Sequence, residues 1–290
     1  MDWEEGRTSG VEDRRGQGGG FGAPHYIGGG GIGAIVIALI GYFVFHIDPR
    51  ALLGAQQQVG PAAQPPSIAS GACPAGDQDC RFADIIHTSA DDTWAALFQA
   101  RGQTYRRSTI VLYSEDTPTG CGDGNAAMGP FYCPEDERVY LDLDFFNTLD
   151  KQLGAPGDFA KAYVIAHEVG HHVQNLLGVS DKVSRLQQSR PDEANALSVK
   201  LELQADCYAG VWARQSNTKL NWINTDDVRQ GLNAAAAVGD DTLQKETQGR
   251  VVPDSFTHGT SAQRMHWFTA GYDSGNPRAC DTFGSQSEVE

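Results

Sequence analysis

Basic residues are scarce in this 290-residue chain. It has 22 lysines and arginines against 37 aspartates and glutamates, which gives a net charge of -15 at pH 7. Nucleic-acid binding needs clustered lysine and arginine side chains that displace counterions, so this composition argues against a nucleic-acid partner. The sequence also lacks internal repeats. Its length and its 40% of hydrophobic residues fit one sizeable domain with appendages, or two small domains.

The six cysteines lack zinc-finger spacing, because no two of them form a C-x-x-C pair. An even number of cysteines with loop-like neighbours favours disulfides, if the domain lies in an oxidising compartment. Free buried thiols are the alternative. The candidate pairs, taken in chain order, are Cys73–Cys80, Cys121–Cys133 and Cys207–Cys280.

One long uncharged run lies near the start of the chain. Residues 27–47, IGGGGIGAIVIALIGYFVFHI, contain no Asp, Glu, Lys or Arg. As a helix they would span about 31 Å, close to the hydrocarbon thickness of a bilayer. The run therefore predicts a transmembrane signal anchor, with a buried helix as the alternative. Arg7, Arg14 and Arg15 precede it and only Arg50 follows closely, which favours a cytoplasmic N-terminus and an extracytoplasmic C-terminal part.

Composition divides the rest of the chain into three parts. Residues 1–26 are charged and Gly-rich, which predicts a disordered cytoplasmic segment. Residues 48–72 are rich in Ala, Gln and Pro, as is typical of a linker. The globular domain is expected over residues 73–290.

Helical patterns dominate this domain, and a small sheet is expected before the histidine-containing helix. Short β-branched or alternating runs predict strands at residues 108–114 and 138–146, the second of them near a sheet edge. Longer patterns predict helices over residues 158–177 and 191–216, and Gly178 is expected to end the first. These elements predict an α+β fold.

The run YVIAHEVGHHVQNLLG, residues 163–178, places three histidines and a glutamate in an apolar helical pattern. His167 and His171 are four residues apart, so on a helix their rings share one face and can meet a single metal ion. Glu168 stands beside the first histidine, where it can accept a proton from a water that the metal activates. H-E-x-x-H is the pattern of zinc metallopeptidases, although five residues alone also match by chance.

A catalytic zinc site of this kind needs a third protein ligand. Glu202 and Asp206, in LELQADCYAG, are four residues apart on one face of the second long helix. One carboxylate would bind the metal and the other would hold the second ring nitrogen of a ligating histidine. A pair that faces solvent is the alternative, but the apolar neighbours would make unpaired carboxylates costly.

The other histidines are expected to differ in role. His172 points elsewhere on the helix from His171 and is expected to be a satisfied structural histidine. His258 precedes GTS in a turn and is the candidate for stabilising a developing oxyanion. His87 and His266 are expected to serve structure.

Four separated blocks of the sequence together resemble one family: HEVGHHVQNLLG, ELQADCYAGVWA, GPFYCPEDERVYLDLDFF and SFTHGTSAQRMHWF. They are similar to the neutral zinc metallopeptidase family of bacterial membrane-anchored proteins, and the resemblance extends from the N-terminal MDWEEGR over nearly the whole chain. It implies a zincin fold. Its Glu-x-x-x-Asp element, as in glutamate-ligated zincins, implies Glu202 as the third ligand and Asp206 as the support of a histidine.

Together, the residues and the resemblance predict a predominantly helical, zincin-like α+β domain with one N-terminal transmembrane helix. The expected function is a zinc peptidase anchored in the bacterial inner membrane, with its domain in the periplasm or otherwise outside the cytoplasm. One Zn²⁺ would be held by His167, His171 and Glu202, with Glu168 as general base. A peptide substrate would add to strand 139–143 as another strand. A zincin-fold protein that binds a partner without cutting it, and a zinc amidase acting on cell-wall peptides, are the alternatives.

Overall fold

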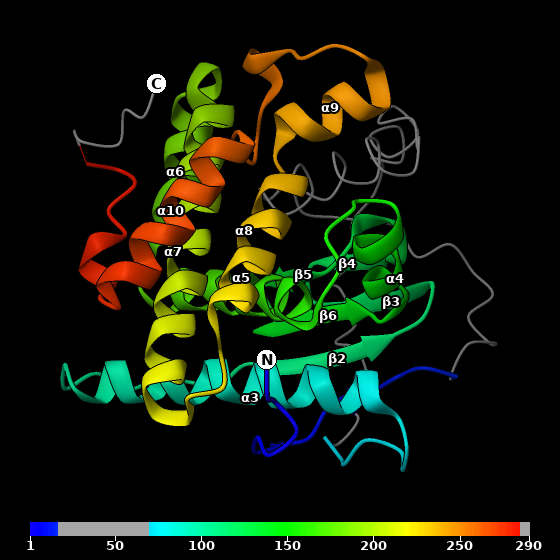
Figure 1. Cartoon of the computed structure of the whole chain (residues 1–290). Helices are drawn as coiled ribbons and strands as arrows, with labels where there is room; N and C mark the ends of the chain where they lie inside the picture. Colours follow the sequence, from blue (N-terminus) through cyan, green and yellow to red (C-terminus); the bar gives the residue numbers. More distant parts are fainter. Residues whose placement is uncertain (17–69, 285–290) are drawn as a thin grey trace.

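The computed structural model describes residues 1–16 and 70–284 (Figure 1). These residues form an α+β arrangement of eight α-helices with a small sheet, as the sequence predicts. The predicted transmembrane run 27–47 and most of the predicted linker lie outside the described residues. Within residues 1–16 and 70–284, no helix combines the length and the apolar character needed to cross a membrane.

The main sheet contains four strands in the order β1-β2-β6-β5. The first three run parallel and β5 runs antiparallel to β6. A separate hairpin of two antiparallel strands, β3 and β4, lies between β2 and β5 in the chain. The strands are β1 (Glu12–Asp13), β2 (Thr109–Tyr113), β3 (Asp116–Thr119), β4 (Gly122–Asn125), β5 (Phe131–Cys133) and β6 (Arg138–Asp142).

The prediction that residues 139–143 lie at a sheet edge is wrong. β6 is paired on both sides, with β2 and with β5. The polar residues of its alternating pattern are covered rather than solvated: Tyr140 stacks on Phe131 at 5.0 Å between ring centroids, and Asp142 accepts hydrogen bonds from the backbone N–H groups of Glu115 and Asp144. Among the described strands the edges of this sheet are β1 and β5, and β5 is the edge strand that contacts α5.

The helices pack around α5, which contacts α3, α7 and α8, while α10 lies along α7 (Figure 1). Most apolar side chains of α5 are buried in this contact region. The helices are α3 (Gln78–Gln99), α4 (Asp144–Lys151), α5 (Asp158–Leu176), α6 (Val179–Ser189), α7 (Ala194–Leu220), α8 (Thr225–Ala237), α9 (Asp240–Gln248) and α10 (Ser261–Ser274). The long predicted helices correspond to α5 and α7.

Two glycines explain how α5 crosses α7 and where α5 ends. A Cβ atom on Gly170 would lie 3.0 Å from the carbonyl oxygen of Ala205, so a glycine lets the two helices approach closely. Gly178 follows α5 with a φ of 71°, in the left-handed region that ends many helices. The close crossing brings the His-rich turn of α5 against the acidic turn of α7.

The expected disorder of residues 1–26 does not hold for residues 1–16. Trp3 is buried, its ring lies edge-on to Phe82 of α3, and its Nε1–H donates to Asp158 of α5. β1 adds to β2 with Glu12 opposite Val111. The segment, dark blue in Figure 1, lies beside α3. The globular unit thus includes the first 16 residues and does not begin only at residue 73.

All three predicted disulfides are present: Cys73–Cys80, Cys121–Cys133 and Cys207–Cys280. The first joins the segment just before α3 to the first turn of α3, and the second joins the β3–β4 hairpin to β5. The third joins α7, one residue after Asp206, to the C-terminal turn η4 (Pro277–Ala279).

Candidate metal centre

α5 and α7 bring three candidate metal ligands together. The Nε2 atoms of His167 and His171 are 3.1 Å apart, and Glu202 carboxylate oxygens lie 3.1 Å from the first and 3.4 Å from the second. Zinc ligands at about 2.0–2.1 Å in tetrahedral geometry lie about 3.3 Å from one another. The three predicted ligands therefore already have the mutual spacing that one zinc ion requires.

The hydrogen bonds of the two imidazole rings fix which nitrogens carry protons. His167 Nδ1 lies 2.9 Å from a carboxylate oxygen of Asp206, and His171 Nδ1 lies 2.8 Å from the amide oxygen of Gln174. Both partners are acceptors, so each Nδ1 is the donor. In neutral rings both Nε2 atoms are then lone-pair donors that face one another and the Glu202 carboxylate. Such a convergence is repulsive unless a cation lies between the three groups, and it fits a divalent metal.

The electrostatic environment also favours a positive charge at this point. Burial alone would lower the pKa of His167, but the adjacent carboxylates of Asp206 and Glu202 outweigh burial and raise that pKa to about 10. Burial raises the pKa of Glu202, and the histidines more than offset it, so this carboxyl is held well below its usual pKa. The site is thus built to hold a cation among ionised carboxylates.

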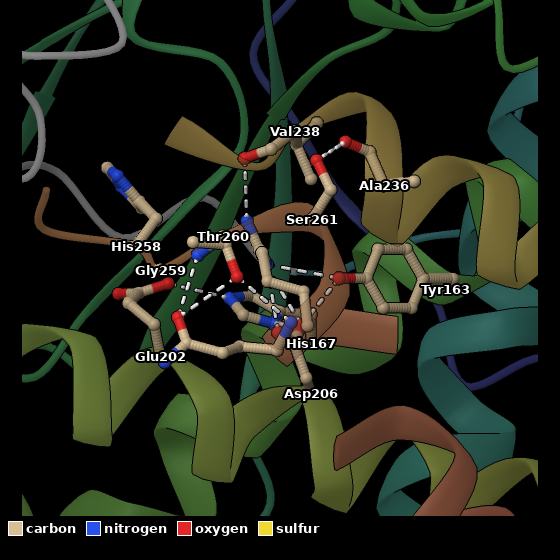
Figure 2. Close-up of polar contacts among 12 residues, drawn as sticks. Tyr163, His167, Glu202, Asp206, Ala236, Val238, His258, Gly259, Thr260 and Ser261 are labelled. Carbon is tan, nitrogen blue, oxygen red and sulfur yellow. Dashed lines mark hydrogen bonds and ion pairs between the residues drawn. The ribbon is translucent and has the colours of Figure 1, made fainter. Parts of the chain in front are cut away.

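Asp206 supports the candidate metal site through His167 and is not one of the three converging groups. Its carboxylate accepts hydrogen bonds from His167 Nδ1–H, from the Tyr163 hydroxyl and from two guanidinium nitrogens of Arg264, at 2.8 and 2.9 Å. Tyr163, His167 and Asp206 converge in Figure 2. The guanidinium also donates to the Val238 carbonyl. Burial raises the pKa of Asp206, but Arg264 and His167 outweigh it and keep this carboxylate ionised.

Sequence reasoning missed both Tyr163 and Arg264. Tyr163 was detectable, since it lies four residues before His167 and shares its helix face. Arg264 comes from α10, and no local spacing ties it to Asp206, 58 residues earlier.

Glu168 is buried beside the ligands with 8% of its surface exposed. Within the described residues no protein group donates a hydrogen bond to its carboxylate. Burial raises the pKa of Glu168, although His171 and His167 partly oppose the shift. A carboxylate with a raised pKa and unused acceptor atoms next to a metal site is suited to accept and return a proton.

His258 is buried in the turn before α10, and a carboxylate that sequence reasoning missed holds it. Asp240, the first residue of α9, accepts the backbone N–H groups of Thr257, His258 and Gly259 and lies 3.2 Å from His258 Nδ1. Burial lowers the pKa of His258, but Asp240 and then Glu202 outweigh it and raise it. Its Nε2 has no hydrogen-bond partner among the described residues.

Of the other described histidines, His172 and His87 are buried and hydrogen-bonded, as expected of structural histidines, whereas His266 is exposed. His172 Nε2–H donates to the Arg106 carbonyl and its Nδ1 accepts from the Tyr132 hydroxyl, so both ring nitrogens are satisfied away from the metal ligands. His87 is buried against Ser108, and His266 is exposed on α10 beside Trp267.

Residues 1–283 match the family described as "Putative neutral zinc metallopeptidase". The match includes the N-terminal segment that packs on the helices.

Two relatives illustrate the similarity. The chain is 48% identical over 292 residues to the uncharacterized protein YpfJ of Escherichia coli strain K12, covering 98% of this chain and 99% of YpfJ. It is 42% identical over 253 residues to the uncharacterized protein Rv2575 of Mycobacterium tuberculosis, covering 82% of this chain and 84% of Rv2575. No solved structure matches the chain.

Proposed function

The chain belongs to the neutral zinc metallopeptidase family, and we propose that it hydrolyses peptide bonds at one Zn²⁺ held by His167, His171 and Glu202. The observation that carries this proposal is the convergence of three lone-pair donors at 3.1–3.4 Å on one point between α5 and α7. Two imidazoles and one carboxylate form the ligand set of catalytic zinc sites, which keep the fourth position open.

When bound, Zn²⁺ supplies Lewis acidity: it polarises a carbonyl oxygen and lowers the pKa of a coordinated water towards 7. The chain supplies the proton transfers. Glu168 accepts the proton of the attacking water and passes it to the leaving amine, a role supported by its burial and its free carboxylate. Asp206 and Arg264 hold the His167 ring in the tautomer whose Nε2 lone pair faces the metal.

His258 is the proposed donor to the oxyanion of the tetrahedral intermediate. Asp240 accepts from its Nδ1 side and raises its pKa, which favours a protonated ring whose Nε2–H is free to donate.

The edge strand β5 is the proposed guide for an extended peptide. Tyr132 of β5 joins this strand to the metal-binding helix, because its hydroxyl hydrogen-bonds to His172 and accepts from the Asn175 side chain of α5. A peptide that adds to the free edge of β5 would thus run beside the helix that carries His167 and His171. This replaces β6 as the guide strand.

An oxidising location outside the cytoplasm is part of the proposal. Three disulfides support it, since structural disulfides persist mainly in such compartments. Attachment to the bacterial inner membrane through residues 27–47 stays a prediction from the sequence.

The experiment compares the full-length wild type with Glu168→Gln, and with Glu193→Gln as a control at an exposed glutamate. Zinc content and hydrolysis of an unfolded casein-type substrate are measured on each protein. Glu168→Gln should keep its zinc and lose about 10²- to 10⁴-fold in rate, while the control is unchanged. A Glu168→Gln protein that cleaves as fast as the wild type contradicts the proposal. Wild-type cleavage of cell-wall peptides alone would favour the amidase alternative, and zinc binding without any cleavage would favour the partner-binding alternative.

A further inference from the structure

The geometry points to Gln174 as the positioning residue of His171, an inference that rests on the proposed zinc site. Gln174 lies three residues after His171 on α5 and is fully buried. Its amide oxygen accepts the Nδ1–H of His171 at 2.8 Å. Since the proton then sits on Nδ1, the Nε2 lone pair of His171 faces His167 and Glu202.

The orientation of the Gln174 amide follows from its other partners. Its Nε2 lies 2.7 Å from the carbonyl oxygen of Leu201, which accepts hydrogen bonds and cannot donate them. This nitrogen also lies 3.1 Å from the side-chain oxygen of Gln204, whose own Nε2 donates to the Cys280 carbonyl at 2.9 Å. The Cys280 carbonyl only accepts, so the Gln204 nitrogen faces it and the Gln204 oxygen faces Gln174. The Leu201 carbonyl also only accepts, so the Gln174 nitrogen faces these two oxygens and the Gln174 oxygen faces His171.

This arrangement explains why an amide, and not a carboxylate, supports the second histidine. The residue behind His171 must accept from an imidazole N–H and also donate to the Leu201 carbonyl, and an ionised carboxylate cannot donate. Asp206 behind His167 has only donors around it, including Arg264. The two ligating histidines are thus oriented by groups of different charge.

The amide chain also links three parts of the fold. Gln174 is on α5, Gln204 is on α7 between Glu202 and Asp206, and Cys280 is joined to α7 by its disulfide with Cys207. The position of the His171 ring is therefore tied to the same turn of α7 that carries the Glu202 ligand.

The test measures zinc dissociation constants of the full-length protein by competition with a chromophoric chelator, together with melting temperatures of the zinc-free forms. Gln174→Leu should weaken zinc binding by about 10- to 100-fold, as is usual for the loss of a group that orients a ligand. Gln174→Glu keeps an acceptor for His171 and should bind zinc more tightly than Gln174→Leu. Gln187→Leu is the control, because Gln187 on α6 hydrogen-bonds only within the α6–α7 region and should leave zinc binding unchanged.

The outcomes separate this inference from the proposed function. Wild type without measurable zinc binding would remove the proposed function itself. Wild type and Gln174→Leu with equal zinc affinity would overturn only the role of Gln174. If Gln174→Leu does not fold, Gln204→Leu tests the same chain, and the inference requires that it weaken zinc binding while Gln187→Leu does not.

A separate observation concerns the two parts of the chain that flank residues 17–69. Val11 and Gly71 exchange two backbone hydrogen bonds of 2.9 Å, and the backbone N–H groups of Ser9 and Gly10 donate to the carboxylate of Asp84 in α3. Arg14 donates to Thr117 and to the Pro118 carbonyl of the β3 strand. The N-terminal segment is thus an integral part of the sheet and of the surface of α3.

We infer that residues 1–16 and residues 70–284 lie on the same side of any membrane that the protein contacts. A single crossing between residues 16 and 70 would separate these two parts by about 30 Å of hydrocarbon, across which the β1–β2 ladder and the Val11–Gly71 pair cannot form. The packing therefore argues against the predicted topology in which the N-terminus is cytoplasmic and the domain is outside.

Labelling in intact cells tests this inference. Thr8→Cys and Asp192→Cys each add one exposed thiol to a chain whose six native cysteines are in disulfides. A membrane-impermeant maleimide is applied to cells before and after lysis. The inference expects both positions to react in intact cells, or both only after lysis. Reaction of Asp192→Cys in intact cells with Thr8→Cys reacting only after lysis would overturn it.

Discussion

Replacing Arg264 by methionine should strongly destabilise the zinc-free protein, although Arg264 is not one of the candidate metal ligands. The Arg264 guanidinium and the Asp206 carboxylate form two hydrogen bonds of 2.8 and 2.9 Å, with side-chain exposures of 5% and 0%. Methionine fills much of the same volume but removes the guanidinium that pairs with the buried Asp206 carboxylate, which leaves His167 as its remaining charged partner. It also removes a donor from Tyr163 and from the Val238 carbonyl.

The size of the effect follows from the cost of an unpaired buried charge. Removing one partner of a buried ion pair costs about 3–5 kcal/mol of the free energy of unfolding. For a domain of this size each kcal/mol lowers the melting temperature by roughly 2–4 °C, so a fall of roughly 6–20 °C is expected. Replacing both Arg264 and Asp206, as Arg264→Met with Asp206→Asn, should cost less than the sum of the two single changes, because no charge is then left unpaired.

Urea unfolding of the chelator-treated proteins, followed by circular dichroism, gives the free energy of unfolding of the wild type, of Arg264→Met, of Asp206→Asn and of the double variant. Arg190→Met is the matched control, since Arg190 and Glu193 form an ion pair on the surface with more than half of each side chain exposed. An Arg264→Met variant as stable as the control, or strictly additive costs in the double variant, would refute the conclusion that Arg264 and Asp206 form a stabilising buried ion pair.

Three further predictions follow from particular contacts. Gly170→Ala should lower both the melting temperature and the zinc affinity, because the new Cβ would lie 3.0 Å from the Ala205 carbonyl where α5 crosses α7; thermal unfolding and zinc competition check this. Replacing Cys207 and Cys280 by alanine should cost about 4 kcal/mol in urea unfolding, against about 3 kcal/mol for the disulfide that closes only 12 residues, since the lost cross-link spans 73 residues. The pKa of Asp240 is lowered, because its hydrogen bonds to His258 outweigh burial, and the pKa of His258 is raised. The stabilisation of the fold that comes from the ionised Asp240 carboxylate is lost as pH falls through the lowered pKa of Asp240. The stabilisation that comes from the protonated His258 ring is lost as pH rises through the raised pKa of His258. Asp240→Asn should therefore lose most stability between about pH 4 and 6.5, and an equal loss at every pH would contradict this.

The parts of the site that local spacing encodes could be predicted from the sequence. His167 and His171, and likewise Glu202 and Asp206, are each four residues apart on one helix, so the period of the helix alone places each pair on one face. The structure brings these two helix faces together. The sequence indicated this contact only indirectly, because the apolar residues around Glu202 and Asp206 imply that the two carboxylates have partners.

The parts that depend on long-range packing could not be predicted in this way. Arg264 reaches Asp206 from another helix, and Asp240 reaches His258 from the start of α9, and neither contact leaves a local pattern. The alternating polar residues of β6 favour an edge strand when the sequence alone is considered. In the structure Tyr140 stacks on Phe131 of β5, and Asp142 accepts a hydrogen bond from the backbone N–H of Glu115.

The N-terminal segment shows the limit of reasoning from composition. Its charges and glycines are typical of disorder, yet Trp3 and Val11 are buried and Asp84 accepts the backbone N–H groups of Ser9 and Gly10. A fragment that begins near residue 71 would lose β1 and the buried Trp3, so the full chain is the proper material for every test above.

Zinc K-edge absorption spectroscopy of the zinc-loaded full chain tests the central claim most directly. The account predicts one zinc per chain with two imidazole nitrogens and carboxylate or water oxygens at about 2.0–2.1 Å. It also predicts that Glu202→Ala lowers zinc affinity while Glu168→Gln keeps the same nitrogen count. A zinc bound by sulfur, a spectrum without imidazole scattering, or unchanged zinc affinity in Glu202→Ala would contradict the assignment of His167, His171 and Glu202 as the metal ligands.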